Sequence, residues 1–588
     1  MTIDETKFND FVELKALEVA IANNGQANPK AILGRCFPVF PEIKSDIPKY
    51  SKTIAQITAK VNELSEEEQK EKIMELNPEF STKKEKKVIP KSDGLPVMDI
   101  KEGESVIVRF PPAPSGHLHL GHLFGIVANY EFKKKYNGKF VLRFEDTNPE
   151  NIDISNYEKI IEDVNWVCDN GVDEVCYQSD RLEIYHKYLR NLVEIGQAFV
   201  CECESEVFKA FTDASEECPH RNIEHSKMME MFDKFMSTDK NNQYKPGTVV
   251  IRAMADLQNK NPALRTFPLA RIIEGNHARI GNKHRVWPNY NMAVAVDDSL
   301  MKMSHVIRGK DLEIGEFRQE MLMKSLGLHK PQYFHYGRMK FTDLELSKSK
   351  LTQKIEDGEF EGWDDPRVPS ILSHRKRGYK AEAFRKSILQ MGISKRDSKI
   401  TKDEYYKGLD FFNKQIIEKE SNRYFSIINP ATVEIENITD IEFDEFTIQK
   451  HPENPAKGLR HIQTIDKYLI EKQDFEKLQV GTKMRLMHFA NFEILSKDDE
   501  NKTVKLKYIS RDYDKSMGIK ANIHFVSANP NETEDITIID SENNTILATS
   551  EKIEKYQIGD SIQFERYGFL RLDLIDEDGE KVFYFTHK

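Results

Sequence analysis

The chain has 588 residues, of which 39% are hydrophobic and 31% charged, and its formal net charge is −11. This length exceeds what one hydrophobic core of ~250 residues can bury, so we expect several domains. The absence of a long apolar run and of a signal-peptide pattern at the polar start MTIDETKFND predicts an intracellular, cytoplasmic protein without a membrane span. The charge excludes a uniformly basic nucleic-acid coat, although local basic patches remain compatible with RNA.

The first part of the chain is predicted to be a helical appendage. Apolar residues recur at helical spacing at Phe11, Leu14, Leu17 and Ala20. The charged stretch STKKEKKVIPKSDG (81–94) then indicates a linker.

A strand–helix–strand unit follows. SVIVRF (105–110) and KFVLRF (139–144) are short runs typical of buried strands, and apolar residues at helical spacing lie between them, ending at Gly138. This order predicts a βαβ unit with a right-handed crossover in a parallel sheet. In such sheets the ligand binds at the carboxyl ends of the strands, beside the helix N-terminus.

Two histidines mark the start of that helix. His119 and His122 lie three residues apart, so they share one face at the end where free backbone N–H groups favour an anion. Gly121 lies between them and lets a flat base approach the backbone. Taken singly, each histidine is better explained as an ordinary polar residue at a helix start, but the group as a whole predicts a phosphate-bearing ligand here.

These residues carry a family resemblance. The stretch from RFPPAPSG (109–116) through HLGH (119–122) to RFEDTNPE (143–150) resembles the glutamyl/glutaminyl subgroup of class I aminoacyl-tRNA synthetases, with HLGH in the place of the HIGH motif. Downstream, ELSKS (345–349) occupies the place of the KMSKS loop, and Lys348 falls on its catalytic lysine. Glu345 and Leu346 depart from that motif, which leaves the role of the first lysine open to Lys350.

The resemblance implies the chemistry of amino-acid activation by ATP with Mg²⁺, followed by transfer to the terminal adenosine of tRNA. It implies that His119, His122 and Lys348 are catalytic, because their N–H groups can stabilise negative charge that grows on the phosphate. The ATP-binding positions that it implies are Pro114, Gly116, His119, Gly121, His122, Ser347, Lys348 and Ser349.

The same resemblance implies which amino acid is bound. Glu145 corresponds to the position that faces the α-amino group, and Arg109, Tyr290 and Arg308 to positions that hold carboxylates. A planar guanidinium matches a carboxylate, and glutaminyl enzymes generally have a small uncharged residue at the position of Arg308. The residues therefore favour L-glutamate, with a surface ion pair of Arg308 as the alternative.

Four further residues form a candidate zinc knuckle. Cys201 and Cys203 in CEC, with Cys218 and His220 in CPHR, are ligand types of tetrahedral zinc sites. His225 is an alternative to His220, and incidental thiols are the alternative to a metal. The three remaining cysteines, Cys36, Cys168 and Cys176, lack a companion pattern and are expected to be apolar and buried.

Beyond the lysine loop, GWDDPRVPSILSHRKRGY (362–379) still resembles the family, and its basic cluster Arg375, Lys376 and Arg377 is a candidate phosphate contact. After about residue 430, segments of alternating apolar and polar residues predict two small β-barrels. Such barrels resemble the anticodon reader of glutamyl enzymes of the archaeal and eukaryotic type.

The predicted fold class is an α/β Rossmann-like parallel-sheet catalytic domain with an inserted acceptor-binding domain, helical segments and C-terminal β-barrels. The expected domains are an N-terminal helical extension and linker (1–100), the two catalytic halves (101–200 and 286–350), the insertion with its zinc knuckle (201–285), a helical connection (351–430) and the barrels (431–588).

The leading functional hypothesis is ligation of L-glutamate to tRNA(Glu) by a monomer. The alternatives are a glutaminyl enzyme, disfavoured by Arg308 and by the cysteine knuckle, and a catalytically inactive tRNA-binding scaffold, disfavoured by the intact HLGH and SKS elements. Whether tRNA(Gln) is also charged is left open.

Overall fold

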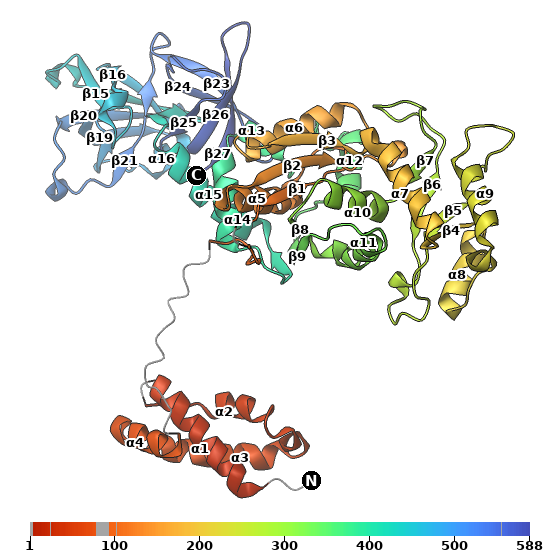
Figure 1. Ribbon diagram of the computed structural model, residues 1–588. Coiled ribbons are helices and arrows are strands. Elements are labelled where there is room, and N and C mark those ends of the chain that lie inside the picture. Colours follow the sequence, from red (N-terminus) through yellow and green to blue (C-terminus); the bar gives the residue numbers. More distant parts are fainter. Residues whose placement is uncertain (1–3, 24, 78–92, 102, 554) are drawn as a thin grey trace. The chain divides into compact units, whose positions relative to one another are not determined.

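The computed structural model describes residues 4–23, 25–77, 93–101, 103–553 and 555–588. It divides the chain into two compact units, Met1–Ser92 and Asp93–Lys588 (Figure 1). Most of the predicted linker at 81–94 lies outside the described residues. Among the helices that are described, none is both long enough and apolar enough to cross a bilayer.

The first unit is helical, as predicted. Its helices are α1 (Glu5–Ala22), α2 (Pro29–Cys36), α3 (Ile47–Asn62) and α4 (Glu66–Leu76). Ser65 starts α4 with a capping box, in which its hydroxyl accepts from the Glu68 N–H and the Glu68 side chain accepts from the Ser65 N–H. The helices enclose their own core, in which Leu17 and Ala20 are fully buried.

The second unit begins with the predicted βαβ unit. Strands β1 (Ile107–Phe110), β2 (Lys139–Phe144) and β3 (Glu174–Tyr177) are parallel and adjacent, and α5 (Leu120–Lys135) connects the first two. Helices α6 (Ser155–Val167) and α7 (Leu182–Glu194) flank β3 in the chain.

A second parallel pair continues this layer. Strands β8 (His305–Gly309) and β9 (Gln332–Tyr336) are joined by α11 (Glu313–Ser325), and α10 (Tyr290–Leu300) precedes them. The Ile107 N–H donates to the Ser304 hydroxyl, and the Ser304 N–H donates to the Ile107 carbonyl. The backbone preceding β8 is thereby bonded to the edge of β1 opposite β2, so the two parallel groups lie side by side.

Between these groups the chain forms an antiparallel sheet. Its strands, in spatial order, are β4 (Ala198–Cys201), β5 (Val250–Ala253), β6 (Pro268–Ile272) and β7 (Val286–Pro288). Helices α8 (Ser205–Ala214) and α9 (His225–Met236) lie between β4 and β5 in the chain. Phe199, Ile251 and Trp287 from this sheet are fully or almost fully buried in one core with α7, α9 and α10.

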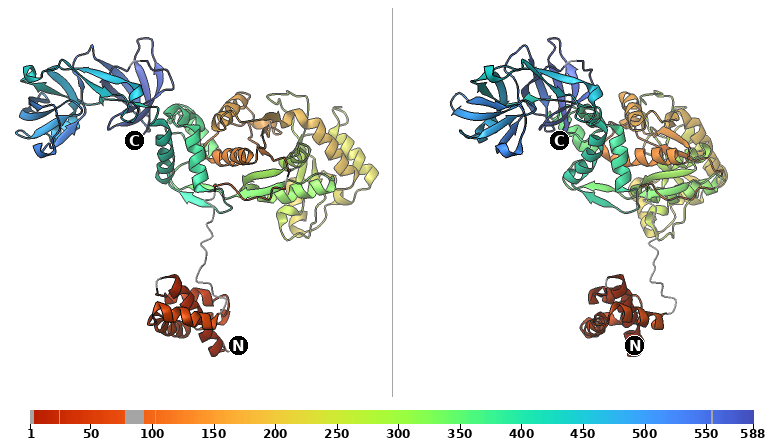
Figure 2. Two further views of the ribbon diagram at one scale, coloured as in Figure 1. Left: turned by 60° about the vertical axis from the view of Figure 1, so that its left-hand side comes forward. Right: turned by 90° about the vertical axis from the view of Figure 1, so that its left-hand side faces the viewer.

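After β9 come β10 (Met339–Phe341), α12 (Lys348–Glu356), α13 (Ile371–Arg377), α14 (Ala381–Met391), β11 (Ser398–Ile400) and α15 (Lys402–Ile417). Figure 2 shows α13 to α15 between the α/β layer and the C-terminal sheets. Arg377 at the end of α13 donates to the carbonyls of Phe585 and Thr586, which ties this connection to the last strand.

The C-terminal part consists of two seven-stranded sheets. One has the order β21-β18-β19-β20-β14-β17-β22 and the other β12-β25-β26-β27-β23-β24-β13. Four of their strands, β19 (Ala490–Asp498), β20 (Thr503–Ser510), β26 (Gly568–Ile575) and β27 (Lys581–His587), lie in the stretch after residue 430 where alternating apolar and polar residues predict β-structure. The remaining strands are β12 (Asn422–Tyr424), β13 (Ser426–Ile427), β14 (Pro430–Ile435), β17 (Lys467–Glu471), β18 (Lys483–Leu486), β21 (Ala521–Ile523), β22 (Val526–Ser527), β23 (Thr533–Ile539), β24 (Thr545–Glu551) and β25 (Ser561–Phe564), with the hairpin β15 (Glu445–Gln449) and β16 (Leu459–Gln463) and the short helix α16 (Lys472–Lys477) beside them. The predicted fold class is confirmed.

Candidate active site and metal centre

The two histidines lie together at the start of α5. His119 is the residue that caps the helix, and the ring centroids of His119 and His122 are 4.0 Å apart. Nδ1 of His119 accepts from the Gly121 N–H, and Nδ1 of His122 accepts from the His119 N–H. Each neutral ring therefore carries its proton on Nε2, where it can donate to a ligand.

Burial keeps both rings neutral. It lowers the pKa of His119 to about 4, with a further contribution from the charge of Lys348. It lowers the pKa of His122 to about 3, and His119 adds to the effect. Near neutral pH the pair consequently offers N–H donors without a full positive charge.

The lysine loop lies directly over the PPAPSG loop. A Cβ placed on Gly116 would come within 2.1 Å of Cε and 2.6 Å of Nζ of Lys348, so a larger residue would displace the end of this side chain; the φ of +152° at Gly116 also favours glycine. A Cβ on Gly121 would lie 3.6 Å from Leu346, which shows that the same loop also reaches the first turn of α5. Segments more than 200 residues apart in the chain are thus brought together, as the motif pair predicts.

The rest of the lysine loop is held by its own residues. The Ser347 N–H and the Lys350 ammonium both donate to the carboxylate of Glu345, at 2.8 and 2.7 Å. The hydroxyls of Ser347 and Ser349 are 3.2 Å apart. In this arrangement the ammonium of Lys350 pairs with Glu345. That Lys350 takes over the role of the first lysine of the KMSKS motif therefore stays a prediction.

The PPAPSG loop is braced from two sides. The Pro114 carbonyl accepts from the Asn156 amide and the Asp153 N–H, both at 3.4 Å. On the other side the Leu120 N–H donates to the Pro369 carbonyl, and the His117 ring stacks on Trp363 at 5.2 Å. The segment that follows the lysine loop therefore helps to fix the start of α5 and the residues just before it.

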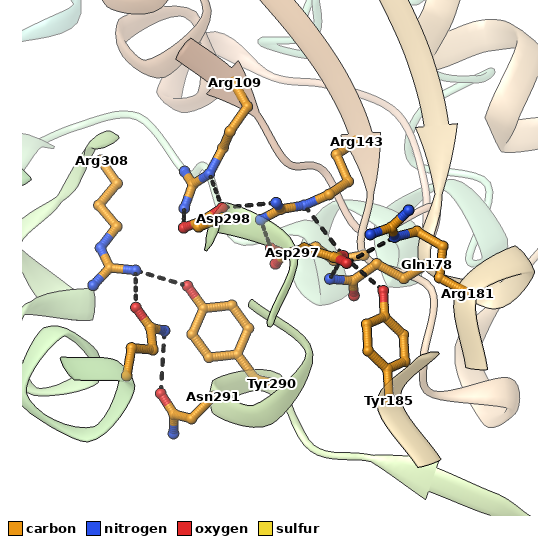
Figure 3. Close-up of polar contacts among 12 residues, drawn as sticks. Arg109, Arg143, Gln178, Arg181, Tyr185, Tyr290, Asn291, Asp297, Asp298 and Arg308 are labelled. Carbon is orange, nitrogen blue, oxygen red and sulfur yellow. Dashed lines mark hydrogen bonds and ion pairs between the residues drawn. The ribbon is translucent and has the colours of Figure 1, made fainter. Parts of the chain in front are cut away.

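Arg109 on β1 is fully buried, and Figure 3 shows its side chain beside Asp298. Its Nε and Nη2 donate to the two carboxylate oxygens of Asp298, at 3.1 and 3.0 Å, and within the described part of the chain its Nη1 has no hydrogen-bond partner. Arg143 donates to the same carboxylate at 2.7 Å and to Glu145 at 3.4 Å. The two arginines lower the pKa of Asp298 to about 2 and thus outweigh its burial.

Glu145 follows directly after β2, and its N–H donates to the Pro112 carbonyl. Burial raises the pKa of Glu145, and the charges of Arg143 and Arg109 oppose that rise. An ammonium group placed beside this carboxylate would favour its charged form.

Arg308 differs from Arg109 because no carboxylate compensates it. It is 3% exposed. Its Nε donates to Nε2 of His335 at 3.1 Å, and its Nη1 donates to Gln319 Oε1 at 3.0 Å and to the Tyr290 hydroxyl at 3.4 Å. Among the described residues none forms an ion pair with it, and its Nη2 is buried without a hydrogen-bond partner. The surface ion pair considered as the alternative is therefore wrong.

The four candidate zinc ligands also converge. One ligand atom from each of Cys201, Cys203, Cys218 and His220 lies within 4.8 Å of the other three. Sγ of Cys201 is 4.0 Å from Sγ of Cys218, and Sγ of Cys203 is 3.3 Å from Nδ1 of His220. This set of soft donors at such spacing fits a tetrahedral zinc ion. His225, the alternative ligand, begins α9 and is not part of the group.

The other cysteines and the basic cluster have internal roles. Cys36 and Cys168 are fully buried, whereas Cys176 is only partly so. Arg375 donates to Glu162 at 2.7 Å and Asp163 at 3.2 Å, and Lys376 donates to Asp364 at 2.8 Å. Together with the carbonyl contacts of Arg377, these pairs account for the cluster without a phosphate.

Several residues that contact the candidate site were not predicted from the sequence. Asp298 holds Arg109, and its neighbour Asp297 accepts from Arg181 at 2.7 Å, from Tyr185 at 2.6 Å and from Gln178 at 3.0 Å. The doublet in VAVDDS offered a signal, because two acids in an apolar helical run need partners. Gln319 and His335 offered none, because their roles depend on where α11 and β9 meet β8.

Two family models match this chain. The model for the catalytic domain of class I tRNA synthetases (E and Q) matches residues 105–419, and the model for their anti-codon binding domain matches residues 421–513.

Relatives match over almost the whole chain. A glutamate–tRNA ligase of Pyrococcus abyssi is 37% identical over 97% of this chain and 98% of its own length. One from Methanobrevibacter smithii is 36% identical over 99% of this chain and 100% of its own. The solved structure of glutamate–tRNA synthetase from Elizabethkingia anophelis is 22% identical, covers 54% of this chain and 71% of that one, and has a TM-score of 0.38. With both family models matched in order and relatives similar from end to end, the chain belongs to the class I tRNA synthetases for glutamate and glutamine.

Proposed function

We propose that this synthetase activates L-glutamate with ATP and transfers it to the 3′-terminal adenosine of tRNA(Glu). The observation that carries the choice of amino acid is the uncompensated guanidinium of Arg308. A buried charge without a counter-ion is costly, so a carboxylate ligand is favoured over a neutral amide. The glutamate–tRNA ligases that match the chain from end to end support the same choice.

The amino acid would be bound by charge complementarity. The side-chain carboxylate of glutamate accepts from Nη2 of Arg308, and the free Nη1 of Arg109 is available to a carboxylate of the same ligand. Glu145 receives the α-ammonium group. Asp298 accepts hydrogen bonds from both Arg109 and Arg143, which orients Arg109 and leaves its Nη1 available.

Activation follows from position and charge. The α-carboxylate of glutamate attacks the α-phosphorus of ATP, which binds as its Mg²⁺ complex; the new O–P bond forms as the bond to pyrophosphate breaks. The Nε2–H groups of His119 and His122 and the ammonium of Lys348 stabilise the growing negative charge on the phosphate oxygens. No protein nucleophile is required, because the reactants are already aligned.

The remaining parts would bind tRNA. We propose the insertion as the support for the acceptor end, and the C-terminal sheets, which include the match to the anti-codon binding domain, as the anticodon reader. We also propose that Cys201, Cys203, Cys218 and His220 hold a structural zinc ion, which would join the two short turns of the insertion. Cytoplasmic localisation and a monomeric state stay predictions.

The test is ATP–pyrophosphate exchange with each amino acid, with and without tRNA. We expect exchange driven by glutamate and dependent on added tRNA. Equal exchange with glutamine would instead assign the chain to the glutaminyl branch, and no exchange with either amino acid would indicate a tRNA-binding protein that has lost catalysis.

A further inference from the structure

Arg308 is held in place by neutral groups alone. Nε2 of His335 can accept from Nε of Arg308 only if that ring is neutral and carries its proton on Nδ1. Nδ1 of the same ring lies 3.5 Å from one carboxylate oxygen of Glu316 on α11, near enough for that negative charge to favour a proton on Nδ1, while the Lys330 ammonium lies 3.5 Å from the other oxygen. His335 is 7% exposed, and its ring lies parallel to that of Tyr333, over which the guanidinium of Arg308 is centred at 4.9 Å.

We propose that Glu316 and His335 are positioning residues that fix Arg308 for glutamate. Glu316 selects the Nδ1–H form of His335, and His335 then fixes the guanidinium through Nε, so that Nη2 is left for the side-chain carboxylate of the ligand. This proposal rests on the proposed function, because it assigns a role within the glutamate pocket.

Gln319 completes the support from the other side. Its Oε1 accepts from Nη1 of Arg308 and, at 3.4 Å, from the Tyr333 hydroxyl. Its Nε2 donates to Oδ1 of Asn291 at 3.3 Å, which sets the orientation of the amide. Two of the three nitrogen atoms of the guanidinium are therefore oriented, and the third is the one without a partner.

The choice of neutral acceptors has a consequence for selectivity. Arg109 receives a carboxylate directly, so its charge is partly cancelled within the protein by Asp298, which it shares with Arg143. A carboxylate on Arg308 would likewise weaken its attraction for a charged ligand, whereas an imidazole and an amide orient the guanidinium and leave its charge available. Burial, together with the charge of Arg308, lowers the pKa of His335 to about 4, which agrees with a neutral ring.

Three single variants test the proposal in the full-length protein. His335→Leu removes the acceptor, and we expect the KM for glutamate to rise about tenfold, as for a lost hydrogen bond to a charged group, with kcat and the KM for ATP unchanged. His335→Gln places an amide oxygen near the position of Nε2 and should keep the KM for glutamate within about threefold of wild type. Glu316→Leu should raise that KM by a smaller factor than His335→Leu.

A double variant isolates the function of Glu316. In the His335→Gln background there is no tautomer to select, so adding Glu316→Leu should have no further effect on the KM for glutamate. The matched control is His329→Leu, which removes an exposed histidine from the segment before β9. Thermal unfolding of each variant shows whether it is folded. If His335→Leu does not fold, the comparison of His335→Gln with the double variant His335→Gln/Glu316→Leu decides the proposal.

The outcomes separate this proposal from the proposed function. The proposal would be overturned by an unchanged KM for glutamate in His335→Leu. It would also be overturned if Glu316→Leu changed that KM equally in the wild-type and His335→Gln backgrounds. Either result would leave the proposed function intact, because the wild-type protein would still charge tRNA with glutamate. Failure of the proposed function would appear earlier, as wild-type protein that does not use glutamate.

Discussion

Replacement of Arg308 by alanine is the sharpest perturbation of the glutamate pocket. The side chain is 3% exposed and none of its hydrogen-bond partners carries a negative charge, so a bound carboxylate would be its counter-ion. Truncation removes this partner and leaves the carboxylate of glutamate in a site from which water is excluded.

The magnitude follows from the burial. Removing one partner of a buried, hydrogen-bonded charge pair costs about 2–5 kcal/mol. The lower limit of about 2 kcal/mol corresponds to a change of ~30-fold in an equilibrium constant. We therefore expect Arg308→Ala to raise the KM for glutamate at least ~30-fold, with little change for ATP, and to narrow the preference over glutamine.

The assay is steady-state aminoacylation with each amino acid in turn, over a range of concentrations. Arg318→Ala is a suitable control, because Arg318 also lies on α11 but donates to the Ala263 carbonyl, outside the pocket. If Arg308→Ala behaves like this control, with unchanged KM and unchanged selectivity, the assignment of Arg308 to the pocket is refuted.

Three further predictions concern the nucleotide site and the metal. Lys348→Ala should lower kcat by about two to four orders of magnitude. Gly116→Ala should also lower kcat, because the added Cβ would lie 2.1 Å from Cε of Lys348 and displace its ammonium group. A wild-type kcat in both variants would show that Lys348 takes no part in the mechanism. His119 and His122, whose pKa values lie at about 4 and 3, should contribute no step to the pH dependence of kcat between pH 6 and 8. As the pH decreases below the ordinary histidine pKa of 6.5, the unfolded chain binds protons that the folded chain does not, so these two residues make the protein less stable as the pH is lowered. A decrease of kcat near pH 6.5 that disappears in His119→Ala would contradict this assignment. Purified protein should contain one zinc ion, as measured by elemental analysis, and Cys201→Ser should release it; fully active protein without zinc would refute the site.

The sequence was most informative where chemistry and local structure coincide. Strand β2 is the predicted run KFVLRF, residue for residue, because a short apolar segment between turns has few alternatives. The HLGH and SKS elements were found by their motifs, and their convergence over Gly116 follows from the parallel sheet between them. The terminal sheets were visible as alternating segments for the same local reason.

The electrostatic partners were much harder to predict. Whether a buried arginine forms an ion pair depends on which acidic residue the fold brings to it. Arg109 donates to the carboxylate of Asp298, whereas the hydrogen-bond partners of Arg308 are all neutral. Asp298 is 189 residues from Arg109 in the chain, so no local pattern connects them. The same long-range placement conceals Glu316 and His335.

The central claim is tested most directly by competition. Glutamate and glutamine, each with its own isotope label and at equal concentration, are offered together to wild-type protein with ATP, Mg²⁺ and bulk tRNA, and the labelled aminoacyl-tRNA is recovered. Recovery of glutamyl-tRNA in large excess is the predicted result, and recovery of glutaminyl-tRNA in equal or greater amount would contradict the account.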